Sequence, residues 1–215
     1  MTASSTSSHS EQEATSRQRL LVATERLLLN EGAHSLSLRR IAAEAKLNTA
    51  LVSYYFGNLE GLLREISALN LGAMVETRRQ WLARAAAEAD PEQRLTLVLE
   101  AYALPLWQTT TLCALPSASV IVEELLGWAG SELRAEMIST INASVEETVK
   151  AMRPLVPHLS DVTLIQRLRM LAGAVVFARP RAYAEALFAI RGAGRETTLD
   201  EILQLMRGAL LIAEA

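Results

Sequence analysis

Residues 37–56 read SLRRIAAEAKLNTALVSYYF, and this stretch decides the fold because it has the pattern of two short helices joined by a tight turn. From Leu38 to Ala45, apolar residues recur at the i, i+3, i+4 and i+7 spacing of an amphipathic helix. Ser37 is expected to cap this helix and Asn48 the next, because short polar side chains accept a hydrogen bond from a first-turn N–H. Two helices joined in this way form a helix-turn-helix, whose second helix has the size to enter a DNA major groove.

The side chains expected to face outward favour contact with DNA. Ala50 and Leu51 can touch a thymine methyl or let the backbone approach a base edge, and the nearby hydroxyls suit phosphate oxygens. Arg39 and Arg40 lie on the exposed side of the first helix, where either can reach a guanine edge or a phosphate. A helical hairpin inside an all-helical bundle, with a solvated arginine pair, is the alternative interpretation. The predicted DNA-contacting residues are Ser37, Arg39, Arg40, Asn48, Thr49, Ala50, Leu51, Ser53, Tyr54 and Tyr55.

A family resemblance extends the argument beyond this pair of helices. From about Arg17 to Ile66 the chain resembles the DNA-binding domain of the TetR family of bacterial regulators. The residues that carry the resemblance are Leu20, Ala23, Leu27, Leu28, Gly32, the run from Ser37 to Ala42, Ala45, the opening Asn48-Thr49-Ala50, Tyr54-Tyr55-Phe56, Glu60, Leu62 and Leu63. The resemblance implies that DNA is contacted by Arg39, Thr49, Ala50, Leu51, Tyr54 and Tyr55.

The chain departs from the family pattern at three positions. Lys46 stands where a glycine is usual in the turn, and Ser53 stands where a tyrosine is usual. Leu59 stands where a lysine often grips a phosphate. These departures concern individual contacts and leave the expected fold unchanged.

Composition predicts a helical protein with a weak charge asymmetry. Half of the 215 residues are hydrophobic and few are aromatic, so the core is expected to consist of Leu, Ala, Val and Ile, which favours helices. The segment from Arg17 to Glu65 holds seven basic and five acidic residues, a net charge of +2, which leaves −5 for the rest of a chain whose net charge is −3. The net positive charge therefore lies on the segment that is expected to bind DNA, and the net negative charge lies on the rest of the chain.

The predicted organisation is an all-α fold with an N-terminal three-helix helix-turn-helix domain and a larger C-terminal helical domain. Residues 1–16 are Ser-, Thr-, Glu- and His-rich and are expected to form a disordered arm. Residues 17–65 form the DNA-binding domain, and residues 66–215 form the ligand-binding and dimerisation domain. Helix breakers within this larger part include Pro105 and Pro180.

Two C-terminal segments are apolar on nearly all sides, residues 168–178 and 199–213. A helix of this kind is buried or faces a partner, so we expect the two segments to form a four-helix homodimer interface with their copies. The alternative is that they form only the core of one chain. The predicted interface residues are Leu168, Leu171, Ala172, Gly173, Val175, Val176, Leu203, Met206 and Leu210.

The family resemblance also implies a small-molecule effector bound within the C-terminal domain. Because few polar groups lie on the apolar faces, we expect this effector to be hydrophobic or amphipathic. Ordinary core packing is the alternative role for each residue that could line such a site. The candidates are Tyr102, Trp107, Trp128, Met137, Met170 and Phe177.

Other site chemistries find little support in the sequence. The single cysteine, Cys113, is expected to be a buried, inert thiol rather than a redox sensor, and it fits a cytoplasmic location. The three histidines have no paired spacing, so no metal and no cofactor are expected. No run of eighteen apolar residues predicts a membrane span. The sequence lacks a phosphate-binding glycine loop and a nucleophile elbow, which argues against an enzyme.

The sequence therefore predicts a cytoplasmic, dimeric transcription regulator that binds a palindromic operator in double-stranded DNA. We expect a repressor that a hydrophobic or amphipathic small molecule releases from its operator. The alternative function is a DNA-binding regulator or architectural protein that takes no small-molecule effector.

Overall fold

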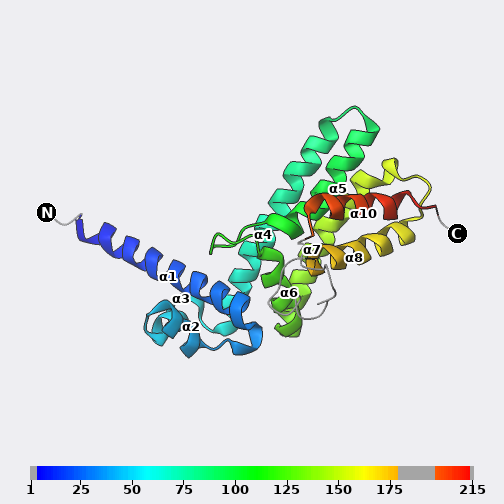
Figure 1. The fold of residues 1–215 in the computed structure, drawn as a ribbon. Helices are drawn as coiled ribbons and strands as arrows, with labels where there is room; N and C mark the ends of the chain where they lie inside the picture. The colour runs from blue at the N-terminus through cyan, green and yellow to red at the C-terminus, as the bar shows by residue number, and fades with distance from the viewer. Residues whose placement is uncertain (1–3, 179–196, 214–215) are drawn as a thin grey trace. The chain divides into compact units, whose positions relative to one another are not determined.

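The computed structural model describes residues 4–178 and 197–213, and these residues form an all-helical fold, as predicted (Figure 1). The predicted break at Pro180 lies outside the described residues. The helices are α1 (Ser4–Glu31), α2 (Leu38–Ala45), α3 (Thr49–Phe56), α4 (Leu59–Ala87), α5 (Pro91–Gln108), α6 (Ala118–Trp128), α7 (Ser131–Met152), α8 (Asp161–Phe177) and α10 (Leu199–Leu211), with short 3-10 helices η1 (Ala33–Ser35) and η2 (Arg153–Leu155). Within the described ranges, no helix combines the length and apolar character that crossing a membrane requires.

The N-terminal arm differs from its prediction, because α1 begins at Ser4 and runs without a break to Glu31. The sequence offers a reason. Residues 11–14 are Glu, Gln, Glu and Ala, which are good helix formers, and extending an existing helix avoids the cost of nucleating a new one. Low hydrophobicity does not exclude a helix.

The described residues divide into two compact units. The head unit comprises the described residues of Met1–Gly72 and Thr110–Ser139, and the body unit comprises those of Ala73–Thr109 and Thr140–Ala215. The head unit therefore contains α6 as well as the helix-turn-helix. The chain passes between the units three times: within α4, between Thr109 and Thr110 after α5, and within α7.

The head unit is built on the carboxyl-terminal half of α1, against which α2 and α3 lie (Figure 1). Leu20 and Leu28 of α1, Ile41 of α2 and Val52 of α3 are all completely or almost completely buried. Gly32 ends α1 with a φ of 80°, a backbone conformation that glycine adopts without strain. These apolar contacts fix the two short helices, which are too short to be stable alone.

Two carboxylates join the later part of the head unit to α1 and η1. Glu25 of α1 is fully buried and accepts hydrogen bonds from the Cys113 N–H at 3.1 Å and from the Asn70 side-chain amide at 2.9 Å. Glu124 of α6 accepts a hydrogen bond at 3.0 Å from the N–H of Ala33 in η1. These bonds explain why α6 groups with the helix-turn-helix.

The body unit packs α5, α8 and α10 around an aliphatic core (Figure 1). Tyr102 of α5 is buried in this core, and its hydroxyl donates to the carbonyl of Leu168 on α8 at 2.7 Å. Burial raises the pKa of Tyr102 to about 12, so its phenol stays protonated at neutral pH. Arg167 of α8 donates to the carbonyl of Ala209 near the end of α10 at 2.7 Å. Side chains from α5 and α8 therefore hold the helices of this unit in register.

Candidate nucleic-acid interface

The first helix of the predicted pair, α2, has the cap and the orientation that its sequence indicates. The Ser37 hydroxyl accepts a hydrogen bond from the Arg40 N–H at 3.2 Å. Ile41, Ala42 and Ala45 are buried, which directs the arginines on the opposite side into solvent. The capping prediction for Ser37 is confirmed, and its hydroxyl oxygen is already engaged by the backbone.

The two exposed arginines of α2 differ in their bonding. The guanidinium of Arg40 forms an ion pair with Glu31 at 2.5 Å, and this partner raises the pKa of Arg40. Among the residues that the structure describes, Arg39 has no ion pair and no side-chain hydrogen bond. Arg39 is therefore the arginine whose charge is not already matched by a protein carboxylate.

The turn after α2 is held by the backbone and by α1. Lys46 adopts a left-handed conformation with φ 54° and ψ 46°, and the N–H of Leu47 bonds to the carbonyl of Ala42 at 2.9 Å. This is the hydrogen-bond pattern of a Schellman motif, in which glycine is the usual residue at the left-handed position. Arg19 of α1 donates to the carbonyl of Ala45 at 2.6 Å. An arginine far away in the sequence thus braces a turn that lacks the usual glycine.

The second helix of the pair, α3, is capped at its start and directs a polar face outward. The Asn48 side-chain oxygen accepts a hydrogen bond from the Ala50 N–H at 2.8 Å, which confirms the predicted cap. Val52 is fully buried, and Tyr54 is 69% exposed. The exposed residues on the outer side of α3 are Thr49, Ala50, Ser53 and Tyr54.

The carboxyl end of α3 is held in place by aromatic and ionic contacts within the head unit. Tyr55 and Phe56 are half-buried, and the Arg17 guanidinium lies 5.3 Å from the centre of the Phe56 ring. Arg17 also forms an ion pair with Glu65 of α4 at 2.5 Å. Because three helices meet at these side chains, the outward face of α3 has a fixed orientation relative to α1 and α4.

A hollow of about 450 Å³ opens beside α2. It brings together Leu27 of α1, the cap of α2, both exposed arginines and one carboxylate. The residues lining the hollow are Leu27, Ser37, Arg39, Arg40, Ala43 and Glu44. The arrangement places two guanidinium groups near the amino end of a helix, which is suitable for a phosphate oxygen.

The predicted DNA-contacting residues therefore fall into two groups. Ser37, Asn48 and Arg40 already use side-chain atoms in caps or an ion pair. The others, wholly or partly exposed on α2 and α3, are Arg39, Thr49, Ala50, Leu51, Ser53, Tyr54 and Tyr55. DNA contact by all of them stays a prediction. Sequence reasoning missed Arg17 and Arg19, whose partners lie far along the chain and leave no local signal.

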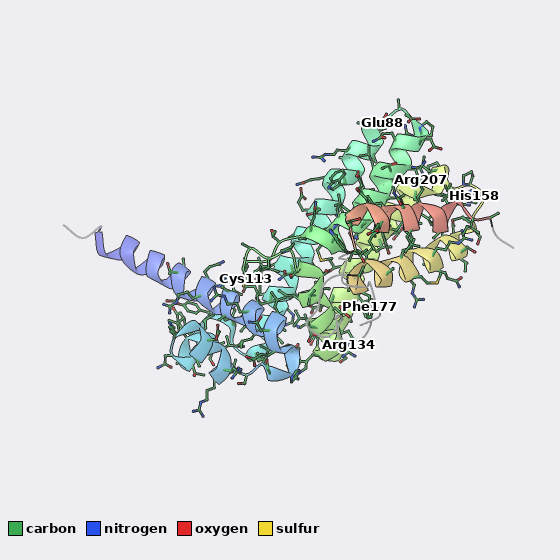
Figure 2. All side chains as sticks on the ribbon, viewed as in Figure 1. Glu88, Cys113, Arg134, His158, Phe177 and Arg207 are labelled. Atoms are coloured by element: carbon green, nitrogen blue, oxygen red, sulfur yellow. The ribbon has the colours of Figure 1, made fainter. Side chains whose placement is uncertain are left out.

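The predicted effector residues do not form one group. Tyr102 is buried in the body core, whereas Met170 and Phe177 on α8 are exposed (Figure 2 labels Phe177). Trp128 and Met137 belong to the head unit. Trp107 is half-buried beside the body core. The set was chosen by residue type alone, and the structure divides it between two units.

The predicted dimer residues differ in burial. Five of the nine are buried within the core of the single chain: Leu168, Leu171, Val175, Met206 and Leu210. Ala172, Val176 and Leu203 are half-buried, and only Gly173 is exposed. The other side of these helices carries exposed apolar side chains that the sequence did not single out, namely Val162, Ile165, Met170 and Phe177 of α8 with Leu205, Leu211 and Ile212 in and just after α10. We call these seven residues and Gly173 the α8–α10 face.

Cys113 lies in the segment before α6 and is half-buried (Figure 2). Burial raises the pKa of its thiol, and the nearby Glu25 carboxylate raises it further. A protonated thiol is a poor nucleophile, which disfavours a sensor role. Within the described ranges, no group of three or more acidic, histidine or cysteine side chains is arranged to hold a metal ion.

Comparisons with known proteins bear on the whole chain and on the helix-turn-helix in particular. Residues 20–66 match the sequence model of bacterial regulatory proteins of the tetR family. No curated protein sequence matches the chain. The family match confirms the resemblance over the segment that contains α2 and α3.

Solved structures share the fold over nearly the whole length. A TetR family transcriptional regulator, PfmR from Thermus thermophilus, is 20% identical with a TM-score of 0.58, over 92% of this chain and 96% of that one. NalD, the secondary repressor of the MexAB-OprM multidrug efflux pump in Pseudomonas aeruginosa, is 20% identical with a TM-score of 0.56, over 93% and 97%. AibR, solved in complex with isovaleryl coenzyme A and operator DNA, is 20% identical with a TM-score of 0.57, over 89% and 96%.

Proposed function

We propose that this chain, whose residues 20–66 belong to the tetR family of bacterial regulatory proteins, is a dimeric transcriptional repressor. In this proposal residues 17–65 read a palindromic operator, and residues 66–215 carry the dimer contacts and an effector site. A hydrophobic or amphipathic small molecule releases the protein from its operator.

The outward face of α3 is the single observation that carries the proposal. Asn48 fixes the start of the helix, Val52 anchors its inner side, and the side chains on the outer side are small or carry hydroxyl groups. Small side chains allow a helix backbone to approach base edges closely, and Ala50 can contact a thymine methyl. Tyr54, the most exposed of the large residues on this helix, suits a phosphate or base-edge contact.

Arg39 and the hollow beside α2 supply the electrostatic part of DNA binding. Phosphate contacts provide most of the affinity of a DNA-binding protein and make it sensitive to salt. Arg39 can pair with a phosphate without first breaking an ion pair, whereas Arg40 must exchange its Glu31 partner. We therefore assign Arg39 the stronger contact of the two.

The α8–α10 face supports a homodimer. Its α8 members lie at positions 162, 165, 170, 173 and 177, which fall on one side of a helix. That side is opposite the buried Leu164, Leu168, Leu171 and Val175. Exposed apolar side chains on one side of a helix are typical of an interaction site, and a twofold partner would cover them with the same side of its own helix. A dimer also places two recognition helices about one DNA helical turn apart, roughly 34–36 Å.

An effector would act by a difference in affinity between two forms of the dimer. A small molecule can bind more tightly to the form of the dimer whose recognition helices are wrongly spaced for the operator. It then lowers operator affinity by the ratio of its affinities for the two forms, with a coupling free energy of about 1–3 kcal/mol. AibR, which shares this fold, was solved with both isovaleryl coenzyme A and operator DNA. That structure illustrates that the fold accommodates both kinds of partner.

The test is a gel-shift titration of the purified protein on the DNA upstream of its own gene, with an unrelated duplex of equal length as the control. We expect binding to the upstream duplex that is at least about a thousandfold tighter than to the control, as is typical of specific regulators. Tyr54→Ala should weaken this binding, and Lys150→Ala, which removes an exposed cation from the body unit, should not. Equal binding to both duplexes would refute the assignment, and a panel of hydrophobic compounds that never releases the duplex would remove the effector from the proposal.

A further inference from the structure

Two adjacent arginines on α4 have opposite environments. Arg79 is exposed, and its guanidinium bonds to both carboxylate oxygens of Glu147 at 3.1 and 3.3 Å. Arg78 is only 5% exposed and lies in the body unit beside the aliphatic core. A buried ion costs free energy unless an opposite charge lies nearby, so the partners of Arg78 need to be identified.

The hydrogen-bond and ring partners of Arg78 among the described residues are neutral. Its Nε–H donates to the carbonyl of Ala101 at 3.3 Å, and its Nη1 donates to the Ser144 hydroxyl at 2.6 Å. Its guanidinium carbon lies 5.7 Å from the centre of the Tyr102 ring. A guanidinium has five N–H donors, and these bonds use two of them. Within the described ranges, no carboxylate forms an ion pair with Arg78, and the nearby Glu147 is already bonded to Arg79.

The charge of Arg78 persists despite this burial. Desolvation lowers the pKa of Arg78, but the guanidinium starts from such a high pKa that it remains protonated in proteins. Ser144 is also buried and uses its hydroxyl oxygen to accept from Arg78, which leaves its hydroxyl hydrogen available to donate. The body unit, over its described residues, therefore holds a buried cation without a paired counter-ion, next to a second hydrogen-bond donor.

We propose that Arg78 and Ser144 form the head-group site for an anionic, amphipathic effector, a carboxylic acid with an apolar tail. A carboxylate carries the single negative charge that one guanidinium balances, whereas a phosphate monoester would bring almost two into a site that holds one cation. The tail would lie near Tyr102, whose ring belongs to the aliphatic core of α5, α8 and α10. This inference rests on the proposed function, because it assigns the chemistry of the proposed effector.

The competing role for Arg78 is a purely structural link between α4, α5 and α7. Stability separates the two roles. If Arg78 serves only as a link, Arg78→Met removes its hydrogen bonds and lowers the melting temperature. If Arg78 is kept for an anionic ligand, Arg78→Met removes a buried charge that no carboxylate of the described residues pairs with directly and leaves the free protein at least as stable as the wild type.

The binding test uses isothermal titration calorimetry of the 215-residue chain without DNA. The probes are hexanoate, octanoate, decanoate and phenylacetate, each compared with the primary alcohol of the same carbon skeleton. We expect at least one acid to bind at least about tenfold more tightly than its alcohol. Arg78→Met should abolish this preference, while the matched control Arg79→Met should retain it. Ser144→Ala should weaken acid binding by a smaller factor.

Several outcomes would overturn the site. They are equal affinity for acid and alcohol, no binding of any acid to the wild type, or an unchanged acid preference in Arg78→Met. Should Arg78→Met fail to fold, which would itself favour the structural role, Ser144→Ala and the wild-type comparison of acid with alcohol still decide the question of binding.

Failure of the site and failure of the proposed function are distinguishable. A protein that shifts its upstream duplex but binds no acid retains the regulatory function and loses this site. A protein that binds an acid through Arg78 but ignores the duplex retains the site and loses the regulatory function.

Discussion

The helix-turn-helix and the α8–α10 pair show how differently two apolar patterns constrain a structure. In α2 the apolar residues occupy one side, so each outward residue follows once the cap and the turn are placed. In α8 apolar residues occur on nearly all sides, and the pattern does not say which side faces the chain's own core. A helix with apolar residues on one side therefore has a predictable orientation. A helix with apolar residues on all sides is predicted only to be covered on more than one side.

A charge placed on the α8–α10 face should give the largest effect, because it tests the side that the sequence left undecided. A Cβ added at Gly173 meets nothing within 4 Å, so Gly173→Glu should leave the single chain folded. In a dimer the carboxylate would be buried against an apolar partner, at a cost of about 3 kcal/mol or more, which raises the dimer dissociation constant at least about a hundredfold. Size-exclusion chromatography with light scattering would detect the monomer.

Asn142→Glu provides the matched control for Gly173→Glu. Asn142 is exposed on α7 and lies outside the α8–α10 face, so this variant should remain a dimer. If Gly173→Glu also remains a dimer at micromolar concentration, the α8–α10 face is not the interface. A wild-type protein that is monomeric would reject the homodimer itself.

Loss of Arg39 should have the next largest effect and tests the side whose orientation the sequence did predict. Arg39→Ala should weaken operator binding by about 1–3 kcal/mol if the guanidinium contacts a base. If it contacts only a phosphate, the slope of log affinity against log salt should fall in magnitude by about 1. Fluorescence anisotropy at several salt concentrations separates these outcomes. Arg40→Ala should weaken operator binding less, because Arg40 must leave its ion pair with Glu31 before it can contact DNA. A larger loss for Arg40→Ala than for Arg39→Ala would contradict the assignment.

Much of the helix-turn-helix was predictable from local sequence because its determinants are local. The caps at Ser37 and Asn48 act within three residues of themselves, and the buried position of Val52 follows from helical spacing. Contacts between residues far apart were not predictable. Arg19 and Ala45 meet across 26 positions, and nothing in the sequence marks them as partners.

The body unit was less predictable for a related reason. The pair Arg78-Arg79 has the sequence signature of a solvated surface, and only the packing of α4 against its neighbours buries one arginine and exposes the other. The grouping of α6 with the head unit likewise involves contacts between residues far apart in the sequence, such as the bond from the Ala33 N–H to Glu124. A sequence pattern indicates whether one side of a helix is buried, but it does not indicate which other helix packs against that side.

Removal of the cap on α3 should have a moderate effect and tests whether local determinants carry the orientation of the recognition helix. Asn48→Ala removes the acceptor for the Ala50 N–H and should reduce the free energy of unfolding by about 1 kcal/mol. Asn142→Ala, at an exposed position inside α7, should change it much less. Thermal unfolding followed by circular dichroism provides the measurement, and equal effects of the two variants would show that the cap adds nothing.

The turn at Lys46 should give the smallest effect, and one of opposite sign. A lysine with φ 54° has a steric cost that glycine avoids, so Lys46→Gly should raise the free energy of unfolding by about 0.5–1 kcal/mol, less the entropy that glycine gains in the unfolded chain. Lys46→Ala keeps the Cβ and removes only the charge, which makes it the matched control with no expected gain. If Arg19 alone holds the turn, Lys46→Gly and Lys46→Ala will melt at the same temperature and Arg19→Ala will destabilise both equally. If the left-handed strain matters, the glycine variant will tolerate loss of Arg19 better than the alanine variant, because its turn needs no external brace to remain formed.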